Sequence, residues 1–297
     1  MQFGIYYAYW ERQWGGDYLR YPKKVADLGF DILEISCASL AKLGAAALKE
    51  LRQAAEDAGV RLTGGYGPKP QENLASGDRA IVRDAFEFWD RTFDALESLG
   101  VTLVGGGLYS YWPVDYGTAG EQSFDKPADL QRSIKNMKRL GDMAAKHHIT
   151  LGMEALNRFE GYLLNTAQET LDYVTAVGRD NVKVMLDTFH MNIEEDSITD
   201  AIRTAGKHLG HFHLGEANRR PPREGGRIDW KSVAATLHEI GYDGAVVMEP
   251  FVLQGGQVGS DIKIWRDLIA NGGETELDEE ARRSVAFVRK VFGKAKK

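Results

Sequence analysis

The sequence predicts an α/β fold in which eight parallel strands and their helices close into a single (β/α)8 TIM barrel over residues 1–297. Short strand-like runs alternate with amphipathic helix-like segments along nearly the whole chain, there are eight such runs, and no change of composition divides them. A doubly wound open sheet is the alternative. It is disfavoured because no GxGxxG turn follows the first strand-like run and no boundary separates two halves.

The strand-like runs are apolar and short, as expected for buried parallel strands. In chain order they cover residues 3–10, 31–37, 60–67, 101–109, 149–156, 182–187, 210–216 and 245–251. The clearest helix-like segments repeat apolar residues at three- and four-residue spacing, and they cover residues 81–100, 129–148 and 229–244. Several helix-like segments end in glycine, at Gly29, Gly100 and Gly241, which suits a left-handed helix end before the next strand.

Composition excludes several classes of protein. With 43% hydrophobic residues in 297, the chain can build a large core, and no apolar run approaches the roughly 20 residues that cross a bilayer. A net charge of −6 argues against a nucleic-acid partner. The one cysteine, Cys37, cannot form an internal disulfide. Since the N-terminus has no signal-peptide pattern, we expect a cytoplasmic protein without a membrane partner, and a short disordered tail at the C-terminal GKAKK.

Four side chains able to bind a metal follow four successive strands. Glu154, Asp187, His213 and Glu249 end the fifth to eighth strand-like runs, and in such a barrel the reactive groups sit where strands end. Alone, an acidic residue there is usually a helix cap, and a histidine in a strand is usually a core residue. Four on neighbouring strands favour a shared metal site, because three converging carboxylates would otherwise repel one another.

The donor types indicate which metal would bind. Three carboxylates and one imidazole suit a divalent ion of intermediate hardness, Mn²⁺ or Co²⁺, with Mg²⁺ as a further candidate. The donor set disfavours a structural zinc site, which is typically rich in thiolate. Four protein ligands leave two positions on an octahedral ion, which matches a sugar carbonyl and its neighbouring hydroxyl. Such binding polarises the carbonyl and acidifies the intervening C–H bond.

The two glutamates indicate what happens at that bond. Glu154 and Glu249 lie three strands apart in a ring of eight, so roughly 135° separates them about the barrel axis. They can therefore address opposite faces of one carbon. If one glutamate removes a proton from one face and the other returns it to the opposite face, the centre is inverted. The simplest outcome is epimerisation next to a carbonyl.

Several segments together resemble the ketose 3-epimerase family, the D-tagatose, D-psicose (D-allulose) and L-ribulose 3-epimerases. They are GIYYAYW, SYWPVDY, MEALNRFE, VMLDTFHMNIEED, GHFHLGEANRR and VVMEPF, and the likeness covers essentially the whole chain. The resemblance implies that Glu154, Asp187, His213 and Glu249 bind Mn²⁺ or Co²⁺. It also implies that Glu154 and Glu249 deprotonate and reprotonate C3 through a cis-enediolate held on the metal.

The resemblance also implies substrates and further site residues. The candidate substrates are D-fructose and D-psicose, D-tagatose and D-sorbose, or L-ribulose and L-xylulose, with the first pair favoured, in a homodimer or homotetramer. It implies that the sugar's oxygens near C1 to C3 are held by Glu160, His190 and Arg219, and that the apolar wall of the pocket consists of Tyr6, Trp14, Trp112 and Phe251. From the residues alone, His190 could equally cap a loop and Arg219 could be a surface charge.

Three other functions compete with this interpretation. A related isomerase or dehydratase, such as hydroxypyruvate isomerase or inosose dehydratase, would use the same metal and glutamates at a different carbon. An endonuclease IV-like barrel would need a histidine-rich zinc cluster and a basic track for DNA, and the sequence has neither. A sugar-binding barrel without turnover would not need both glutamates.

Overall fold

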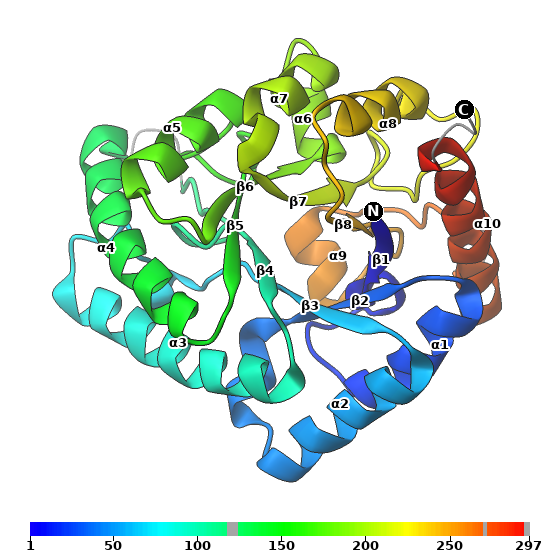
Figure 1. Ribbon diagram of the computed structural model, residues 1–297, viewed down its shortest axis with the longest axis horizontal. Coiled ribbons are helices and arrows are strands. Elements are labelled where there is room, and N and C mark those ends of the chain that lie inside the picture. The colour runs from blue at the N-terminus through cyan, green and yellow to red at the C-terminus, as the bar shows by residue number, and fades with distance from the viewer. Residues whose placement is uncertain (118–123, 270–271, 294–297) are drawn as a thin grey trace.

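A computed structural model describes residues 1–117, 124–269 and 272–293, and its strands form one closed parallel barrel in chain order (Figure 1). The fold prediction is therefore confirmed. The strands are β1 Gln2–Tyr6, β2 Ile32–Ser36, β3 Arg61–Gly65, β4 Leu103–Gly106, β5 Thr150–Glu154, β6 Val182–Asp187, β7 Leu209–Leu214 and β8 Ala245–Met248. The disordered tail expected at the C-terminus falls largely on residues 294–297, which lie outside the described residues.

Most strands are shorter than the apolar runs that predicted them. The first run continues beyond β1 as a turn of 3₁₀ helix, η1 (Tyr7–Trp10), whose residues are all buried. The eighth run leaves the sheet after Met248, so Glu249 follows the strand. Apolar character marks burial rather than strand pairing, and segments just past the strand ends, such as η1, are buried without belonging to the sheet.

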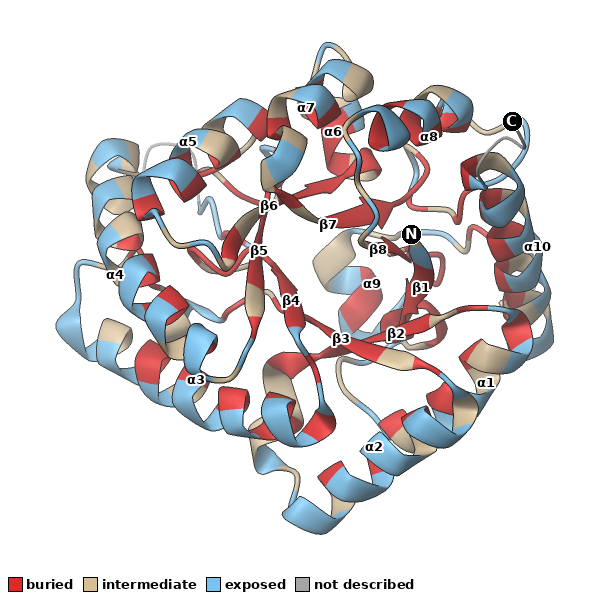
Figure 2. Cartoon of the chain, viewed as in Figure 1, coloured by how far each residue is buried: buried red, intermediate tan, exposed pale blue. Residues whose placement is uncertain are grey.

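The longer helices surround the barrel, and Figure 2 shows their buried residues on the inner side and exposed residues outside. The short helix Gly256–Ile262 lies inside this ring in the same view, and three of its residues line the central cavity. The α-helices are α1 Tyr21–Leu28, α2 Ala45–Ala58, α3 Arg79–Leu99, α4 Lys126–Lys146, α5 Ala167–Val177, α6 Thr188–Glu194, α7 Ile198–Ala205, α8 Trp230–Glu239, α9 Gly256–Ile262 and α10 Glu274–Phe292. The other short 3₁₀ helices are η2 Tyr18–Arg20, η3 Cys37–Lys42, η4 Pro70–Glu72 and η5 Gly206–His208. Within the described ranges, none of the helices has both the length and the apolar character required to span a bilayer.

Glycines end the helices as predicted. Gly29 follows α1 with φ 101° and Gly100 follows α3 with φ 73°, both in the left-handed region that other residues disfavour. Gly241 also has a positive φ, of 72°, but it is not the C-cap of α8, because Ile240 takes that position after the last helical residue, Glu239. These turns return the chain directly to the next strand.

The barrel interior changes from apolar to polar along the strand direction. At the start of the strands Ile32, Leu103, Ala245 and Val247 form a separate apolar cluster. Further along β2 the inward residue is Glu34, which is completely buried. A layer of hydrocarbon thus lies towards the amino end of the barrel, and completely buried polar side chains such as Glu34 lie between this layer and the carboxyl end, where a site would lie.

Two glycines of β4 let neighbouring groups approach closely. A Cβ on Gly105 would lie 2.4 Å from Met185 Sδ in the barrel interior. Gly106 has φ 128°, and a Cβ there would lie 2.2 Å from the carbonyl oxygen of Tyr66. Both positions require the absence of a side chain, which explains the run of glycines at this strand end.

We predict that Gly106→Ala lowers the free energy of unfolding by about 2–4 kcal/mol, because it adds both backbone strain and a clash. Chemical denaturation followed by circular dichroism measures this. Gly44→Ala is the control, since Gly44 has a negative φ and open space around its Cα, and it should cost less than about 1 kcal/mol. Equal stability of the two variants would contradict this account.

Candidate metal and active site

The four predicted metal ligands come together at the carboxyl end of the barrel. Glu154 ends β5, Asp187 ends β6, His213 lies next to the end of β7, and Glu249 directly follows β8. Asp187 and His213 are register partners on adjacent strands. One ligand atom from each of the four residues lies within 4.8 Å of the other three. The sequence prediction that these residues converge is therefore confirmed.

The position of Asp187 is set by the turn from β6 into α6. Its side chain caps the helix, because Oδ1 accepts a hydrogen bond of 2.8 Å from the backbone N–H of Phe189. The other oxygen, Oδ2, is buried and has no hydrogen-bond partner among the described residues. Helix capping thus fixes the carboxylate and leaves Oδ2 facing the ligand cluster, where Arg219 Nη1 lies 3.7 Å away.

The cluster has the properties of a cation site. Besides Asp187 Oδ2, the buried atoms Glu154 Oε1 and His213 Nδ1 have no hydrogen-bond partner among the described residues. Burial, reinforced by the charges of Glu249 and Asp187, raises the pKa of Glu154 well above its usual value. Unpartnered buried polar atoms and mutually repelling carboxylates are both costly, and a divalent ion would relieve both. These residues fit a metal ion.

Arg219 connects the four candidate metal ligands to the other polar residues of the site. Its Nη1 donates to Glu249 Oε2 at 3.1 Å, and its Nη2 donates to Glu160 Oε1 at 2.9 Å. The guanidinium also lies 3.8 Å from the centre of the Phe189 ring, a cation–π contact. Arg219 is buried, so the surface charge that the residue type alone allowed is excluded.

Glu160 is held as a carboxylate by three donors. Besides Arg219, Trp112 Nε1 donates to its Oε2 at 2.9 Å and Asn157 Nδ2 donates to its Oε1 at 3.0 Å. Burial raises the pKa of Glu160, but the charge of Arg219 and these hydrogen bonds outweigh it and lower the pKa to about 2. Glu160 is therefore ionised and fixed in direction near physiological pH.

His190 is oriented by its neighbour Asn157. Its Nδ1 accepts a hydrogen bond of 3.1 Å from the backbone N–H of Asn157, so in the neutral ring the proton is on Nε2. That Nε2 lies 3.6 Å from Glu154 Oε1. Burial lowers the pKa of His190, which favours the neutral ring. His190 thus presents one N–H donor beside the four candidate metal ligands.

The four aromatic residues predicted to form the apolar wall lie in a continuous chain of edge-to-face contacts. Trp14 contacts Trp112 and Phe251 with ring centres 5.8 and 6.0 Å apart, and Phe251 contacts Tyr6 at 6.2 Å. Trp14 Nε1 donates to Asp261 Oδ2 of α9 at 2.7 Å. The four rings therefore form one packed aromatic surface.

Most of these groups surround one cavity of about 580 Å³. It is lined by ten of the eleven predicted site residues, namely Tyr6, Trp14, Trp112, Glu154, Glu160, His190, His213, Arg219, Glu249 and Phe251. Asp187 is completely buried and lies behind the lining. The cavity has space for a small polar ligand beside the four candidate metal ligands.

The sequence analysis missed three residues that support this site. Asn157 orients His190, and the buried Tyr109 donates its hydroxyl to the carbonyl oxygen of Glu154 at 2.8 Å. Glu34 contacts His213 from across the barrel. Glu34 could have been found from its sequence, because a glutamate within the apolar run DILEISC must be inward and partnered.

Residues 22–290 match the family described as the xylose isomerase-like TIM barrel. The chain is 48% identical to the D-psicose 3-epimerase of Enterocloster bolteae, over 99% of this chain and 96% of that protein. It is 50% identical to the D-psicose 3-epimerase of Ruminiclostridium cellulolyticum, over 98% of each.

Solved structures agree with these sequence matches. The crystal structure of a D-psicose 3-epimerase in the presence of D-fructose superimposes with a TM-score of 0.95 and 48% identity, covering 99% of this chain and all of that one. The Clostridium cellulolyticum D-psicose 3-epimerase with D-tagatose also gives 0.95, with 49% identity over 98% and 99% of the two chains. The chain with this buried carboxylate and histidine cluster belongs to the ketose 3-epimerase family of xylose isomerase-like TIM barrels.

Proposed function

We propose that this chain is a metal-dependent ketose 3-epimerase that interconverts D-fructose and D-psicose. The observation that carries the proposal is the convergence of Glu154 and Glu249 with Asp187 and His213 at one end of one cavity. Relatives at 48% and 50% identity named D-psicose 3-epimerase support this choice of sugars. Related ketoses such as D-tagatose and L-ribulose are further candidate substrates.

The proposed metal is Mn²⁺ or Co²⁺, held by Glu154, Asp187, His213 and Glu249. The support is the donor set, three carboxylates and one imidazole, which suits ions of intermediate hardness. When bound, such an ion acts as a Lewis acid that polarises the sugar carbonyl and acidifies the neighbouring C–H bond. The protein's own side chains carry out the proton transfers and hold the sugar.

Glu154 and Glu249 are the proposed proton-transfer pair at C3. They come from β5 and from the end of β8, three strands apart around the barrel, so a sugar carbon between them is approached from two sides. One carboxylate takes the C3 proton and leaves an enediolate, and the other returns a proton to the opposite face. Burial and the charges of Glu249 and Asp187, which raise the pKa of Glu154, favour its uptake of a proton.

Three other residues are proposed to hold the sugar's oxygens near C1 to C3. His190 offers its Nε2–H, Arg219 offers guanidinium N–H groups, and Glu160 accepts from hydroxyls. The opposite side of the sugar would lie against the aromatic wall formed by Tyr6, Trp14, Trp112 and Phe251. These fixed contacts would keep C3 between the two glutamates during both proton transfers.

A homodimer or homotetramer is proposed as the working assembly. Phe159 and Trp265 support it, because their side chains are exposed at 71% and 72% in this chain. Aromatic residues are enriched in protein interfaces. Phe159 also precedes Glu160, so a contact there would lie close to the sugar site.

The function is tested with a panel of sugars. The Mn²⁺-loaded protein is incubated with D-fructose, D-psicose, D-tagatose and L-ribulose, and the products are separated by carbohydrate chromatography. We expect the C3 epimer of each accepted sugar, carrying deuterium at C3 when the reaction runs in D₂O, and no reaction after EDTA treatment until Mn²⁺ is restored. Aldoses or dehydrated products would contradict the proposal, and so would full activity in EDTA.

Replacing the two glutamates tests the proton-transfer pair. We expect Glu154→Gln and Glu249→Gln each to lower kcat on D-psicose by about 10²–10⁴-fold at saturating Mn²⁺, because an amide cannot take up the C3 proton. Bound Mn²⁺ is measured in each variant, which separates lost chemistry from lost metal. Glu239→Gln at the end of α8 is the control, since Glu239 is exposed and pairs with Arg203. Near-normal turnover by either active-site variant, loaded with Mn²⁺, would rule out the two-glutamate scheme.

His190→Ala tests the sugar contacts separately. Removing one hydrogen bond to the sugar should raise KM about 10- to 100-fold and lower kcat by less, because the proton-transfer pair stays in place. Steady-state kinetics on D-psicose give both constants. His208→Ala serves as control, since His208 lies in η5 at the opposite end of the barrel. A loss confined to kcat would mean that His190 acts in the chemical step instead.

A further inference from the structure

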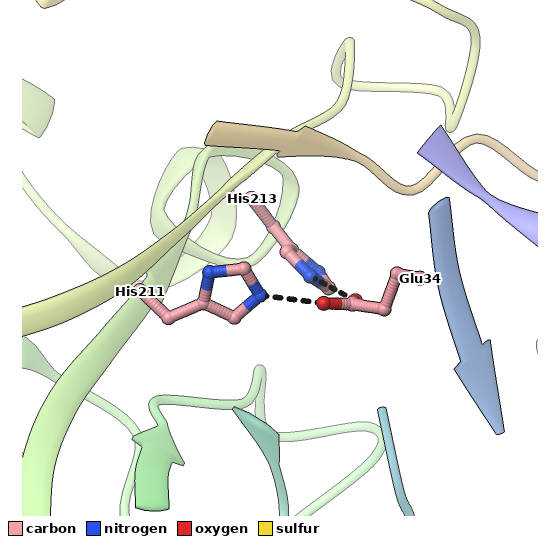
Figure 3. Close-up of side chains that lie close together, drawn as sticks. All are labelled: Glu34, His211 and His213. Carbon is pink, nitrogen blue, oxygen red and sulfur yellow. Dashed lines mark hydrogen bonds and ion pairs between the residues drawn. The ribbon is translucent and has the colours of Figure 1, made fainter. Parts of the chain in front are cut away.

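The barrel interior holds a buried carboxylate that takes no part in the proposed proton transfer. Glu34 extends from β2 across the interior towards β7, and its side chain is only 1% exposed (Figure 3). Its Oε1 accepts from His213 Nε2 at 2.7 Å, and its Oε2 accepts from His211 Nε2 at 2.8 Å and from the Thr63 hydroxyl at 2.8 Å. One oxygen therefore binds the proposed metal ligand His213, and the other binds His211 and Thr63 in the barrel interior.

These contacts decide which nitrogen of each histidine carries the proton. A carboxylate that receives three hydrogen bonds has no proton of its own to donate, so both histidines must present Nε2–H to Glu34. In the neutral ring of His213, Nδ1 is then left with its lone pair. That Nδ1 is buried without a hydrogen-bond partner among the described residues and lies 3.7 Å from Glu249 Oε2, within the ligand cluster.

The neighbouring strands leave room for this arrangement. A Cβ on Gly105 would lie 2.8 Å from His211 Cδ2, and a Cβ on Gly65 would lie 3.4 Å from Glu34 Oε1. Glycines on β3 and β4 thus make space for one carboxylate and two imidazoles in the middle of the barrel. This space accommodates Glu34 and the two histidines, whereas the layer nearer the amino end of the barrel is filled by apolar side chains.

We propose that Glu34 is a positioning residue for the metal site, which holds the His213 ring in its Nε2–H form so that Nδ1 faces the ion. A carboxylate that accepts from the outer nitrogen of a metal-binding histidine fixes the ring and strengthens the inner nitrogen as a ligand. The inference rests on the proposed metal-dependent function. It adds a residue on β2, outside the four strands that carry the ligands.

Glu34→Gln is the variant that tests this role. The amide has nearly the same shape but carries one acceptor oxygen and one donor NH₂, so it cannot accept from both histidines at once. Turning its NH₂ towards His213 would move the proton of that ring to Nδ1 and remove the metal ligand. The alternative turn would leave His211 facing a donor and would give His213 a neutral amide oxygen in place of a carboxylate. An amide oxygen is the weaker acceptor, so either orientation weakens His213 as a metal ligand.

The first measurement is Mn²⁺ affinity, followed by the electron paramagnetic resonance signal of the free ion. We expect Glu34→Gln to raise the dissociation constant for Mn²⁺ by about 10- to 100-fold. The Mn²⁺ concentration that gives half-maximal epimerisation should rise by the same factor, and added Mn²⁺ should largely restore kcat. A residue needed only for folding would not give this recovery.

Thr63→Val is the matched control. It removes the hydroxyl bonded to Glu34 Oε2 from the same buried position, but it leaves the bond between Glu34 and His213 intact. Its Mn²⁺ affinity should stay near that of the wild type. Equal weakening by Thr63→Val and Glu34→Gln, or unchanged affinity in Glu34→Gln, would overturn the inference. If the wild type itself binds no Mn²⁺, the proposed function fails instead.

A second measurement needs no variant at Glu34 and covers the case in which Glu34→Gln does not fold. Two-bond ¹H–¹⁵N spectra of the wild type saturated with diamagnetic Mg²⁺ report the protonated nitrogen of His213, assigned by its absence in His213→Asn. We expect a proton on Nε2, hydrogen-bonded and slow to exchange with water. A proton on Nδ1, or an Nε2 proton that exchanges freely, would overturn the inference.

Discussion

The site depends on one electrostatic constraint, the convergence of like charges in a buried place. Parallel strands in a closed barrel all end at the same rim, so acidic residues at the ends of adjacent strands necessarily come together. Glu154, Asp187 and Glu249 do so where water is scarce, and burial and its neighbours' charges raise the pKa of Glu154. Such an arrangement is stable only if positive charge compensates it. A divalent cation supplies that charge in the proposed function, and the same ion would activate the sugar.

The chain supplies its own positive charge beside the cluster, and this extends the network to the substrate contacts. Arg219 donates to Glu249 on one side and to Glu160 on the other. Glu160 is bonded in turn to Asn157, which also fixes His190. A sugar hydroxyl entering this network meets donors and acceptors whose directions are already set. Preorganisation of this kind lowers the cost of holding C3 in place through two proton transfers.

Much of this could be predicted from the sequence, because the strand ends follow from apolar runs and a barrel has only one rim for reactive groups. Residues at those ends, such as Asp187 and Glu249, were found in this way. The sequence could not show that Asn157 orients His190, or that Glu34 reaches His213, because partners from distant segments are chosen by packing. Most predicted strands also extended too far, because buried segments beyond the strands, such as the 3₁₀ helix η1, are as apolar as the strands themselves. The apolar pattern of the sequence predicts which residues are buried, whereas the side-chain partners from distant segments become visible only in the folded structure.

The loop that carries Arg219 shows how the fold supports a strained functional residue. Arg219 has φ 66°, a left-handed conformation that costs a residue with a side chain about 1–3 kcal/mol and persists only where the surrounding contacts offset that cost. Backbone hydrogen bonds hold it there, because the Arg219 N–H donates to the carbonyl oxygen of Glu216 at 2.9 Å and the Phe251 N–H donates to the carbonyl oxygen of Arg219 at 2.9 Å. The buried carboxylate of Glu216 joins this turn to the segment that follows it, since Oε1 accepts from Trp230 Nε1 at 2.8 Å and Oε2 accepts from the backbone N–H of Arg227 at 2.8 Å. A Cβ on Gly226 would lie 1.9 Å from Glu216 Oε1, so the glycine in PPREGG admits that carboxylate. Residues 221–226 therefore pack against the turn from which the Arg219 guanidinium reaches Glu160 and Glu249.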